Sequence, residues 1–220
     1  MARIVSLVPS ITELLCELGL ADQLVGRTGF CIHPRETLKR IPKVGGTKSV
    51  KLEKVRALAP THVIVNVDEN TRETANALAA FVPKLIVTHP LGPLDNLALY
   101  RQVGGAFGKE REAEALCSRF ELAFREAEKR KFPRREVLYL IWKDPWMTVS
   151  RDTYISRMLA LFGLETLPPG PAALPGDYFG RILAERCRSG PAFERTLSLQ
   201  EFPLGGNSGQ DRQARASHRR

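Results

Sequence analysis

Two tryptophans flank a short loop that directly follows a predicted strand. Trp142 and Trp146 lie at the ends of the segment WKDPW, after the apolar residues 137–141, and the chain has no other tryptophan. Folds in which strands and helices alternate place many ligand contacts in loops at strand ends. Indole faces also stack well on flat ligands. The pair therefore predicts a ligand surface, and packing of Trp142 beneath the following helix is the alternative.

The residue types that bind metals are spread out along the chain. His33 and His89 each precede a proline and have no second ligand at metal-binding spacing. The absence of a C-x-x-C pair argues against both a zinc site and a disulfide framework. We therefore expect no metal site. The cysteines are Cys16, Cys31, Cys117 and Cys187.

Neither of the two common phosphate-binding loops follows a predicted strand. The patterns G-x-G-x-x-G and G-x-x-x-x-G-K-[ST] are both absent from those positions. The glycine-rich segment GGAFG at residues 104–108 lies in a predicted helical region, where it would kink a helix. We assign no catalytic residue and expect a binding protein, not an enzyme. The alternative is a cytoplasmic α/β enzyme or nucleotide-binding protein on a Rossmann-like fold.

The composition indicates a globular protein with a basic surface. Of the 220 residues, 43% are hydrophobic, and the formal charge is +9. No predicted helix carries Lys and Arg on one face, so we expect no nucleic-acid partner. The first apolar run, residues 4–8, stops at Pro9 and is too short for a secretory signal. The chain as given is expected in the cytoplasm, or in the periplasm or at the cell surface if a signal lies upstream.

Strands and helices alternate at short intervals through residues 1–93. This order predicts an N-terminal α/β lobe with a mainly parallel sheet. Ser10 and Glu13 match a capping box at the start of the first helix. The predicted strands cover residues 3–8, 23–28, 61–67 and 84–89, and the predicted helices cover residues 10–20, 49–60 and 71–81.

A long helical segment follows the first lobe. Residues 94–131 are predicted to form one bridging helix, interrupted only around Gly104 and Gly105. Residues 132–204 then repeat the order of strand, loop, capped helix and glycine, which predicts a second α/β lobe. The basic tail, residues 205–220, is expected to be disordered. One apolar stripe with helical spacing runs along the bridge, at Ala113, Leu116, Phe120 and Phe124.

Three stretches of the chain, in the right order, resemble one family. They are RIVSLVPSITELLCELGLADQLVG, KVGGTKSVKLEKVRALAPTHVIV and VLYLIWKDPWMTVSRDTYISRML. They are similar to the cobalamin and ferric-siderophore binding proteins of ABC importers, the helical-backbone metal-receptor superfamily. The resemblance implies two Rossmann-like lobes joined by a long rigid helix, a ligand held between them, and only slight closure on binding.

The resemblance also implies the ligand and the residues that contact it. The ligand would be a metal chelate, with cobalamin or a related corrinoid as first choice and a ferric siderophore or haem next. Such a ligand brings its own metal, so the protein needs aromatic faces and a few hydrogen-bond donors, and no intrinsic cofactor. The implied ligand-binding residues are Phe30, Thr47, Asn66, Trp142, Trp146, Met147, Tyr178 and Phe179.

An ABC transporter permease is the partner that the resemblance implies. In the family, one acidic residue on each lobe docks into a basic pocket of the permease. The first falls at Glu53 in VKLEKV, where a helix N-terminal charge is a compatible structural role. The second falls near Glu185 in ILAERC.

The chain departs from the family toward its end. The segment LSLQEFPLGGNSG has polar residues where the last strand of the second lobe is expected. The sequence therefore leaves open that the second lobe is incomplete, and a single-base deletion in the gene is one hypothesis for this. An incomplete lobe would expose apolar surface and favour a dimer or aggregation.

Overall fold

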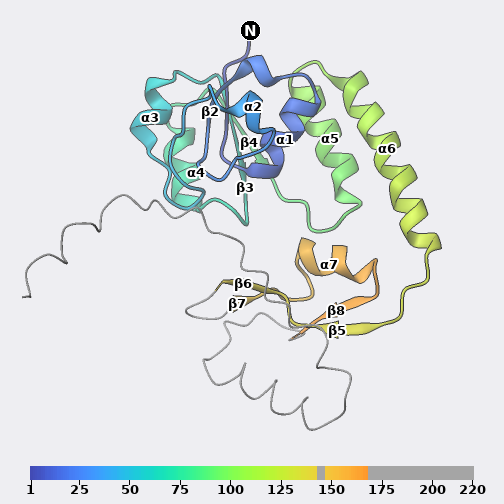
Figure 1. Cartoon of the computed structure of the whole chain (residues 1–220). Coiled ribbons are helices and arrows are strands. Elements are labelled where there is room, and N and C mark those ends of the chain that lie inside the picture. Colours follow the sequence, from blue (N-terminus) through green and yellow to red (C-terminus); the bar gives the residue numbers. More distant parts are fainter. Residues whose placement is uncertain (143–146, 168–220) are drawn as a thin grey trace, which may run out of the picture. The chain divides into compact units, whose positions relative to one another are not determined.

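The computed structural model describes residues 1–142 and 147–167 (Figure 1). The chain divides into two compact units, Met1–Ala173 and Leu174–Arg220, and the second lies outside the described residues. The described part contains the predicted mixture of strands and helices. The lobe boundaries at residues 93, 131 and 204 stay predictions.

A four-stranded parallel sheet forms the centre of the N-terminal part, and its strands are ordered β2-β1-β3-β4. Val63, Ile64 and Val65 on β3 are all buried, because helices cover both faces of the sheet, as is usual for parallel sheets. The predicted α/β class with a mainly parallel sheet is therefore confirmed. The strands are β1 (Ile4–Ser6), β2 (Leu24–Arg27), β3 (His62–Asn66) and β4 (Lys84–Thr88).

Two separate apolar clusters pack on the two faces of this sheet. Ile4 and Ile64 belong to one cluster, whereas their neighbours Val5 and Val63 belong to the other. This follows from the alternation of side chains along a strand. The first cluster includes residues of α1 (Pro9–Glu17) and α5 (Asp95–Ala106), and the second includes residues of α3 (Leu52–Ala57) and α4 (Arg72–Ala79). Figure 1 shows these helices on opposite sides of the sheet.

The expected capping box at the start of α1 is wrong. Pro9 occupies the first turn and Val8 is the N-cap, with no side-chain capping bond. Proline suits the first helical position because its fixed φ matches the helix and its missing N–H would be unpaired there. Ser10 is therefore already inside the helix. The short helix α2 (Arg35–Leu38) and a 3₁₀ turn at Ala21–Gln23 complete this region.

The expected single helix over residues 94–131 is two helices. α5 ends at Ala106, and α6 (Glu110–Lys129) begins after Gly108, which has a φ of +66°. Gly104 has a different role: a Cβ there would lie 2.5 Å from the Cβ of Ala113. The glycine therefore allows close packing of α5 against α6 and does not interrupt α5.

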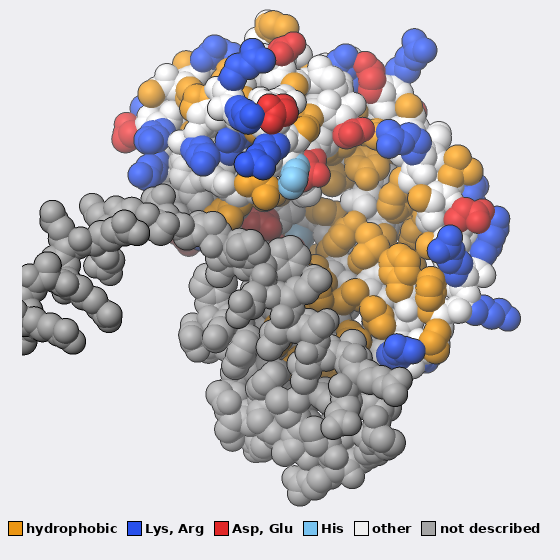
Figure 2. All heavy atoms as spheres, in the orientation of Figure 1, with side chains coloured by type: hydrophobic (Ala, Val, Ile, Leu, Met, Phe, Trp, Pro, Cys, Tyr) orange, Lys and Arg blue, Asp and Glu red, His pale blue; other side chains and the backbone are white. Residues whose placement is uncertain are grey.

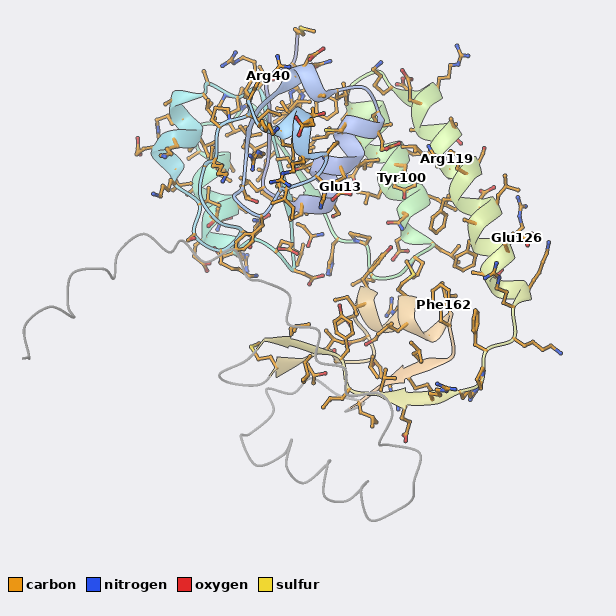
Figure 3. All side chains as sticks on the ribbon, viewed as in Figure 1. Glu13, Arg40, Tyr100, Arg119, Glu126 and Phe162 are labelled. Carbon is orange, nitrogen blue, oxygen red and sulfur yellow. The ribbon has the colours of Figure 1, made fainter. Side chains whose placement is uncertain are left out.

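The apolar stripe predicted on the bridging segment is confirmed on α6. Ala113 is fully buried. The ring of Phe120 lies 6.3 Å from the ring of Tyr100 on α5 and 5.7 Å from the ring of Phe124. Figure 3 shows Tyr100 on α5 beside α6. Aromatic contacts of this kind stabilise the pairing of the two helices beyond the burial of area.

The remaining described residues form two short strand pairs and one helix. β5 (Arg135–Val137) pairs in parallel with β8 (Leu164–Thr166), and α7 (Tyr154–Ala160) lies between them in the chain. The predicted strand-loop-helix repeat differs in one respect: β6 (Leu140–Trp142) pairs with β7 (Met147–Thr148) in an antiparallel hairpin. The WKDPW loop therefore connects two strands, not a strand and a helix.

Two local features complete the description of this part. Thr153 caps α7, because its side chain accepts a hydrogen bond from the Ser156 backbone N–H. Among residues 1–142 and 147–167, no helix is long and apolar enough to cross a membrane.

Candidate functional site

The carboxyl ends of the four parallel strands meet at one edge of the N-terminal sheet. Ser6 on β1 is paired with Arg27 on β2, and Asn66 on β3 is paired with Thr88 on β4. The loops that follow these strands therefore start from the same edge. In open parallel sheets this edge is where ligands bind.

Exposed apolar side chains lie in the loops that start from this edge. We call them the apolar rim, which consists of Phe30, Ile32, Val67, Leu91 and Leu94. Their exposed fractions range from 40% for Leu91 to 64% for Phe30. Single exposed apolar residues are common, but a set in loops at the carboxyl ends of several strands is typical of a ligand-binding surface. The rim offers apolar contacts to a flat or rounded ligand.

Phe30 and Thr47 lie in two loops that contact one another. The Gly29 backbone N–H donates to the Gly45 carbonyl oxygen at 2.7 Å. The Phe30 ring also lies close to Gly46, since a Cβ at Gly46 would be 3.3 Å from Phe30 Cε2. The double glycine therefore lets the 45–51 loop approach the aromatic ring. Phe30 remains 64% exposed in this arrangement and is available to a ligand.

Asn70 joins three segments at this edge, and it was not among the residues selected from the sequence. Its Oδ1 accepts from the Asn66 backbone N–H at 2.9 Å. Its Nδ2 donates to the carbonyl oxygens of Thr47 at 2.9 Å and Leu7 at 3.4 Å. Asn70 is 6% exposed, so these bonds lie away from solvent. The one available signal was the turn-forming segment NVDEN.

Asn66 forms the turn that follows β3. Its Oδ1 accepts from the backbone N–H groups of Asp68 at 2.8 Å and Glu69 at 3.3 Å. Its Nδ2 donates to Thr88 Oγ1 at 3.4 Å, and the residue is 9% exposed. These bonds are the structural role that an asparagine before a turn commonly has. A ligand contact by Asn66 stays a prediction.

Charged groups near the rim are engaged with one another. His89 Nε2 lies 3.5 Å from Asp68 Oδ1, and the Lys48 ammonium donates to the Asp68 carbonyl oxygen at 2.6 Å. Within residues 1–142 and 147–167, no group of three or more His, Cys, Asp and Glu side chains could hold a metal ion. The described edge therefore offers surface contacts and not a ready-made set of metal ligands.

Glu53 lies in the first turn of α3, and its side chain is 87% exposed. Its Oε2 is 4.0 Å from Arg56 Nε, a contact of little strength at such exposure. The carboxylate is therefore accessible to a partner protein while it also complements the helix dipole.

The other predicted site residues lie in the C-terminal part of the chain. Met147 is on β7 and is 38% exposed. Trp142 ends β6, and only its backbone is described. The rest of the predicted ligand-binding and docking residues lie outside the described residues: Trp146, Tyr178, Phe179 and Glu185.

Several known proteins are similar in sequence to this chain. It is 29% identical over 167 residues to the ABC transporter substrate-binding lipoprotein YvrC of Bacillus subtilis, covering 71% of this chain and 52% of YvrC. It is 26% identical over 174 residues to the vitamin B12-binding protein of Yersinia pestis, covering 75% of this chain and 59% of that protein. The chain therefore spans little more than half the length of these relatives.

Solved structures share the fold. The apo form of the periplasmic haem-binding protein RhuT from Roseiflexus sp. RS-1 has a TM-score of 0.68 and 27% identity, over 78% of this chain and 70% of that one. The periplasmic vitamin B12-binding protein BtuF of Vibrio cholerae has a TM-score of 0.73 and 17% identity, over 84% of this chain and 73% of that one.

The family match covers most of the chain. Residues 4–187 match the periplasmic binding protein family, which includes the sheet, both long helices and the loops that carry the apolar rim. The match agrees with the parallel sheet and with the carboxyl-edge loops described above. The chain belongs to the periplasmic binding protein family.

Proposed function

We propose that this chain is the substrate-binding component of an ABC importer and that it binds a metal chelate. A corrinoid such as cobalamin is the first choice, and haem or a ferric siderophore comes next. The family membership over residues 4–187 carries the proposal. The relatives support the choice of ligands, because they include vitamin B12-binding and haem-binding proteins.

The apolar rim supports a ligand with a broad apolar face. Corrinoids and haem present such a face, and they bring a metal that the protein need not supply. Phe30 is the best-placed contact among the described residues, because it is exposed and because its loop is held by the Gly29–Gly45 hydrogen bond. Stacking on one aromatic ring contributes about 0.5–1.5 kcal/mol beyond area burial.

Tryptophan fluorescence provides a direct test. The full chain is titrated with cobalamin, cobinamide, haem and a ferric siderophore, and at least one is expected to quench the emission at about micromolar concentration. Binding of only one class would identify the ligand. If none of the four quenches the fluorescence or binds in equilibrium dialysis at this concentration, the proposed function is wrong.

A matched pair of variants locates the binding surface. Phe30→Ala removes an exposed ring from the apolar rim, whereas Leu122→Ala removes a similarly exposed apolar side chain from α6; the exposed fractions are 64% and 60%. We expect Phe30→Ala to weaken chelate binding about two- to ten-fold, the equivalent of the stacking energy above. Leu122→Ala is expected to bind as the wild type does. If the two variants weaken chelate binding equally, the ligand does not bind at the apolar rim.

Docking onto a permease and location outside the cytoplasmic membrane belong to the same proposal. Glu53 is the described residue that would make the permease contact, since its carboxylate is exposed at the start of α3. Cell fractionation tests the location. Recovery of the native protein only in the cytosol would contradict a role in import.

A further inference from the structure

A cavity of about 570 Å³ lies beside the end of β2, between the segment that follows α2 and the helix α3. None of the rim residues, and none of the described residues predicted to contact the chelate, lines it. Its size is sufficient for a small organic molecule. The lining residues are Arg27, Lys39, Arg40, Ile41, Pro42, Lys43, Val44, Lys54, Ala57 and Leu58.

Positive charge dominates the lining, which contains five cationic side chains and no acidic one. One of them, Lys39, is paired with Glu36 at 2.8 Å. Arg40, Lys43 and Lys54 have no ion pair with any of the described acidic residues. Figure 2 shows Lys and Arg side chains gathered over this part of the chain, and Figure 3 labels Arg40 there. Several positive charges gathered around one cavity attract an anion.

Arg27 adds a buried charge to this cavity. The residue is 7% exposed. Its guanidinium donates only to carbonyl oxygens: Nε and Nη2 to Leu38 at 3.1 and 3.0 Å, and Nη1 to Thr28 at 3.2 Å and Cys31 at 2.8 Å. No described carboxylate balances the charge. Burying an ion without a counter-ion is unfavourable, and an anion in the adjacent cavity would offset it.

Part of the cavity lining is apolar and tightly packed. Val44 is 1% exposed and Ile41 is 8% exposed. A Cβ at Gly26 would lie 2.7 Å from Leu58 Cδ1 and 3.2 Å from Val44 Cγ1, so these side chains pack directly onto β2. This part of the lining therefore has little freedom to collapse into the cavity. The exposed lining residues Pro42 and Ala57 can contact the organic part of an anion.

We propose that this cavity binds an anion with at least two phosphate groups. Five cations, of which Glu36 offsets one, leave an excess of four positive charges. Two phosphate groups, each with about −1.5 to −2 charges at neutral pH, match this excess. Arg and Lys side chains also form strong charge-assisted hydrogen bonds to phosphate oxygens. The phosphate can belong to a soluble organic diphosphate or to the headgroup of a diphosphate lipid.

Calorimetric titration of the full chain with sodium pyrophosphate at low ionic strength tests the site. The double variant Lys43→Ala/Lys54→Ala removes two exposed cations of the cavity and is expected to weaken binding by about ten-fold or more. The control, Arg72→Ala/Lys131→Ala, removes the same charge from exposed positions outside the cavity and should bind as the wild type does. Circular dichroism checks that both variants are folded.

Vesicle flotation distinguishes the two sources of phosphate. Vesicles of phosphatidylcholine with a polyprenyl diphosphate, whose headgroup carries two phosphates, are compared with phosphatidylcholine alone. Pyrophosphate binding that only the cavity variant loses indicates a soluble ligand. Flotation that depends on the polyprenyl diphosphate and that only the cavity variant loses, without pyrophosphate binding, indicates a lipid.

Two results would overturn the proposal: no binding of either probe, or equal weakening in the cavity variant and the control. The chelate titration on the same variants is independent, because the cavity shares no residue with the apolar rim. A failure of one proposal therefore does not imply a failure of the other.

Discussion

Asn70 holds the 45–51 loop against the end of β3, because its Nδ2 donates a hydrogen bond to the Thr47 carbonyl oxygen at 2.9 Å. The same side chain also bonds to the backbone of Asn66 and of Leu7. One buried amide thus fixes the relative positions of three segments at the carboxyl edge of the sheet. The apolar rim lies in loops of that edge.

The variant Asn70→Ala is expected to destabilise the protein by about 1–3 kcal/mol, because it leaves buried backbone groups unpaired. Chelate binding should weaken as well, because the Thr47 loop is released. Urea unfolding and the fluorescence titration measure the two effects. Asn76→Ala, at an exposed position of α4, is the control and should weaken neither, although the higher helix propensity of alanine can raise stability by a few tenths of a kcal/mol. If the Asn70→Ala variant unfolds at the same urea concentration as the wild type, the hydrogen bonds of Asn70 do not hold the three segments together.

Neighbouring glycines in α5 are predicted to respond in opposite directions to alanine. A Cβ at Gly104 would lie 2.5 Å from Ala113 Cβ and 2.9 Å from the Lys109 carbonyl oxygen, whereas a Cβ at Gly105 would meet nothing within 4 Å. Gly104→Ala should therefore destabilise by about 1–3 kcal/mol through overpacking. Gly105→Ala should stabilise by up to about 1 kcal/mol, since alanine favours a helix. Thermal or urea unfolding compares them, and equal effects would contradict the close packing of α5 on α6.

The pKa of His62 gives the stability a dependence on pH. Burial first, and the charge of Lys84 second, lower this pKa below its ordinary value. The unfolded chain, with a histidine pKa of about 6.5, therefore takes up protons more readily than the folded protein. The contribution to stability is fully present above about pH 6.5 and is lost as the pH falls through the lower, folded-state pKa.

Unfolding experiments between pH 7.5 and pH 5 measure this contribution. His62→Gln is expected to reduce the slope of stability against pH over this range, although the loss of the ring contact with Phe107 at 4.9 Å will lower stability at every pH. A His62→Gln slope equal to that of the wild type would show that another group is responsible.

Glu53→Gln is predicted to separate docking from ligand binding. The substitution keeps the shape of the side chain and removes the exposed charge at the start of α3. Binding to membrane vesicles that contain the importer should weaken and chelate affinity should stay unchanged, while stability should fall by no more than about 0.3–1 kcal/mol, the contribution of the charge to the helix dipole. Glu73→Gln, in the first turn of α4, is the matched control. Equal docking of the two variants would exclude Glu53 from the permease contact.

The parallel sheet was predictable because its strands are continuous apolar runs separated by short helical patterns. Residues 61–67 and 84–89 contain the observed β3 and β4. The end of α5 was misplaced because paired glycines resemble a helix break, whereas here Gly104 is needed for contact with Ala113. Only the three-dimensional packing distinguishes these two uses of glycine.

The candidate site was predicted only in part. The resemblance selected Phe30 and Thr47, and the structure places their loops in contact through Gly29 and Gly45. Asn70 was missed, because its partners are up to 63 residues away in the sequence. Four rim residues were missed for a related reason: Ile32, Val67, Leu91 and Leu94. Whether an apolar residue in a loop is exposed or buried depends on contacts with residues far away in the sequence, which its sequence neighbours do not specify.

The alternation of side chains on the central strands has an energetic consequence. The clusters around Leu15 on one face and Leu78 on the other are divided by the backbone of the sheet. Free-energy changes from substitutions in the two clusters should therefore add, with little coupling, as is usual for sites without shared contacts. Either face could then be redesigned by itself, while the opposite face continues to hold the strands in register.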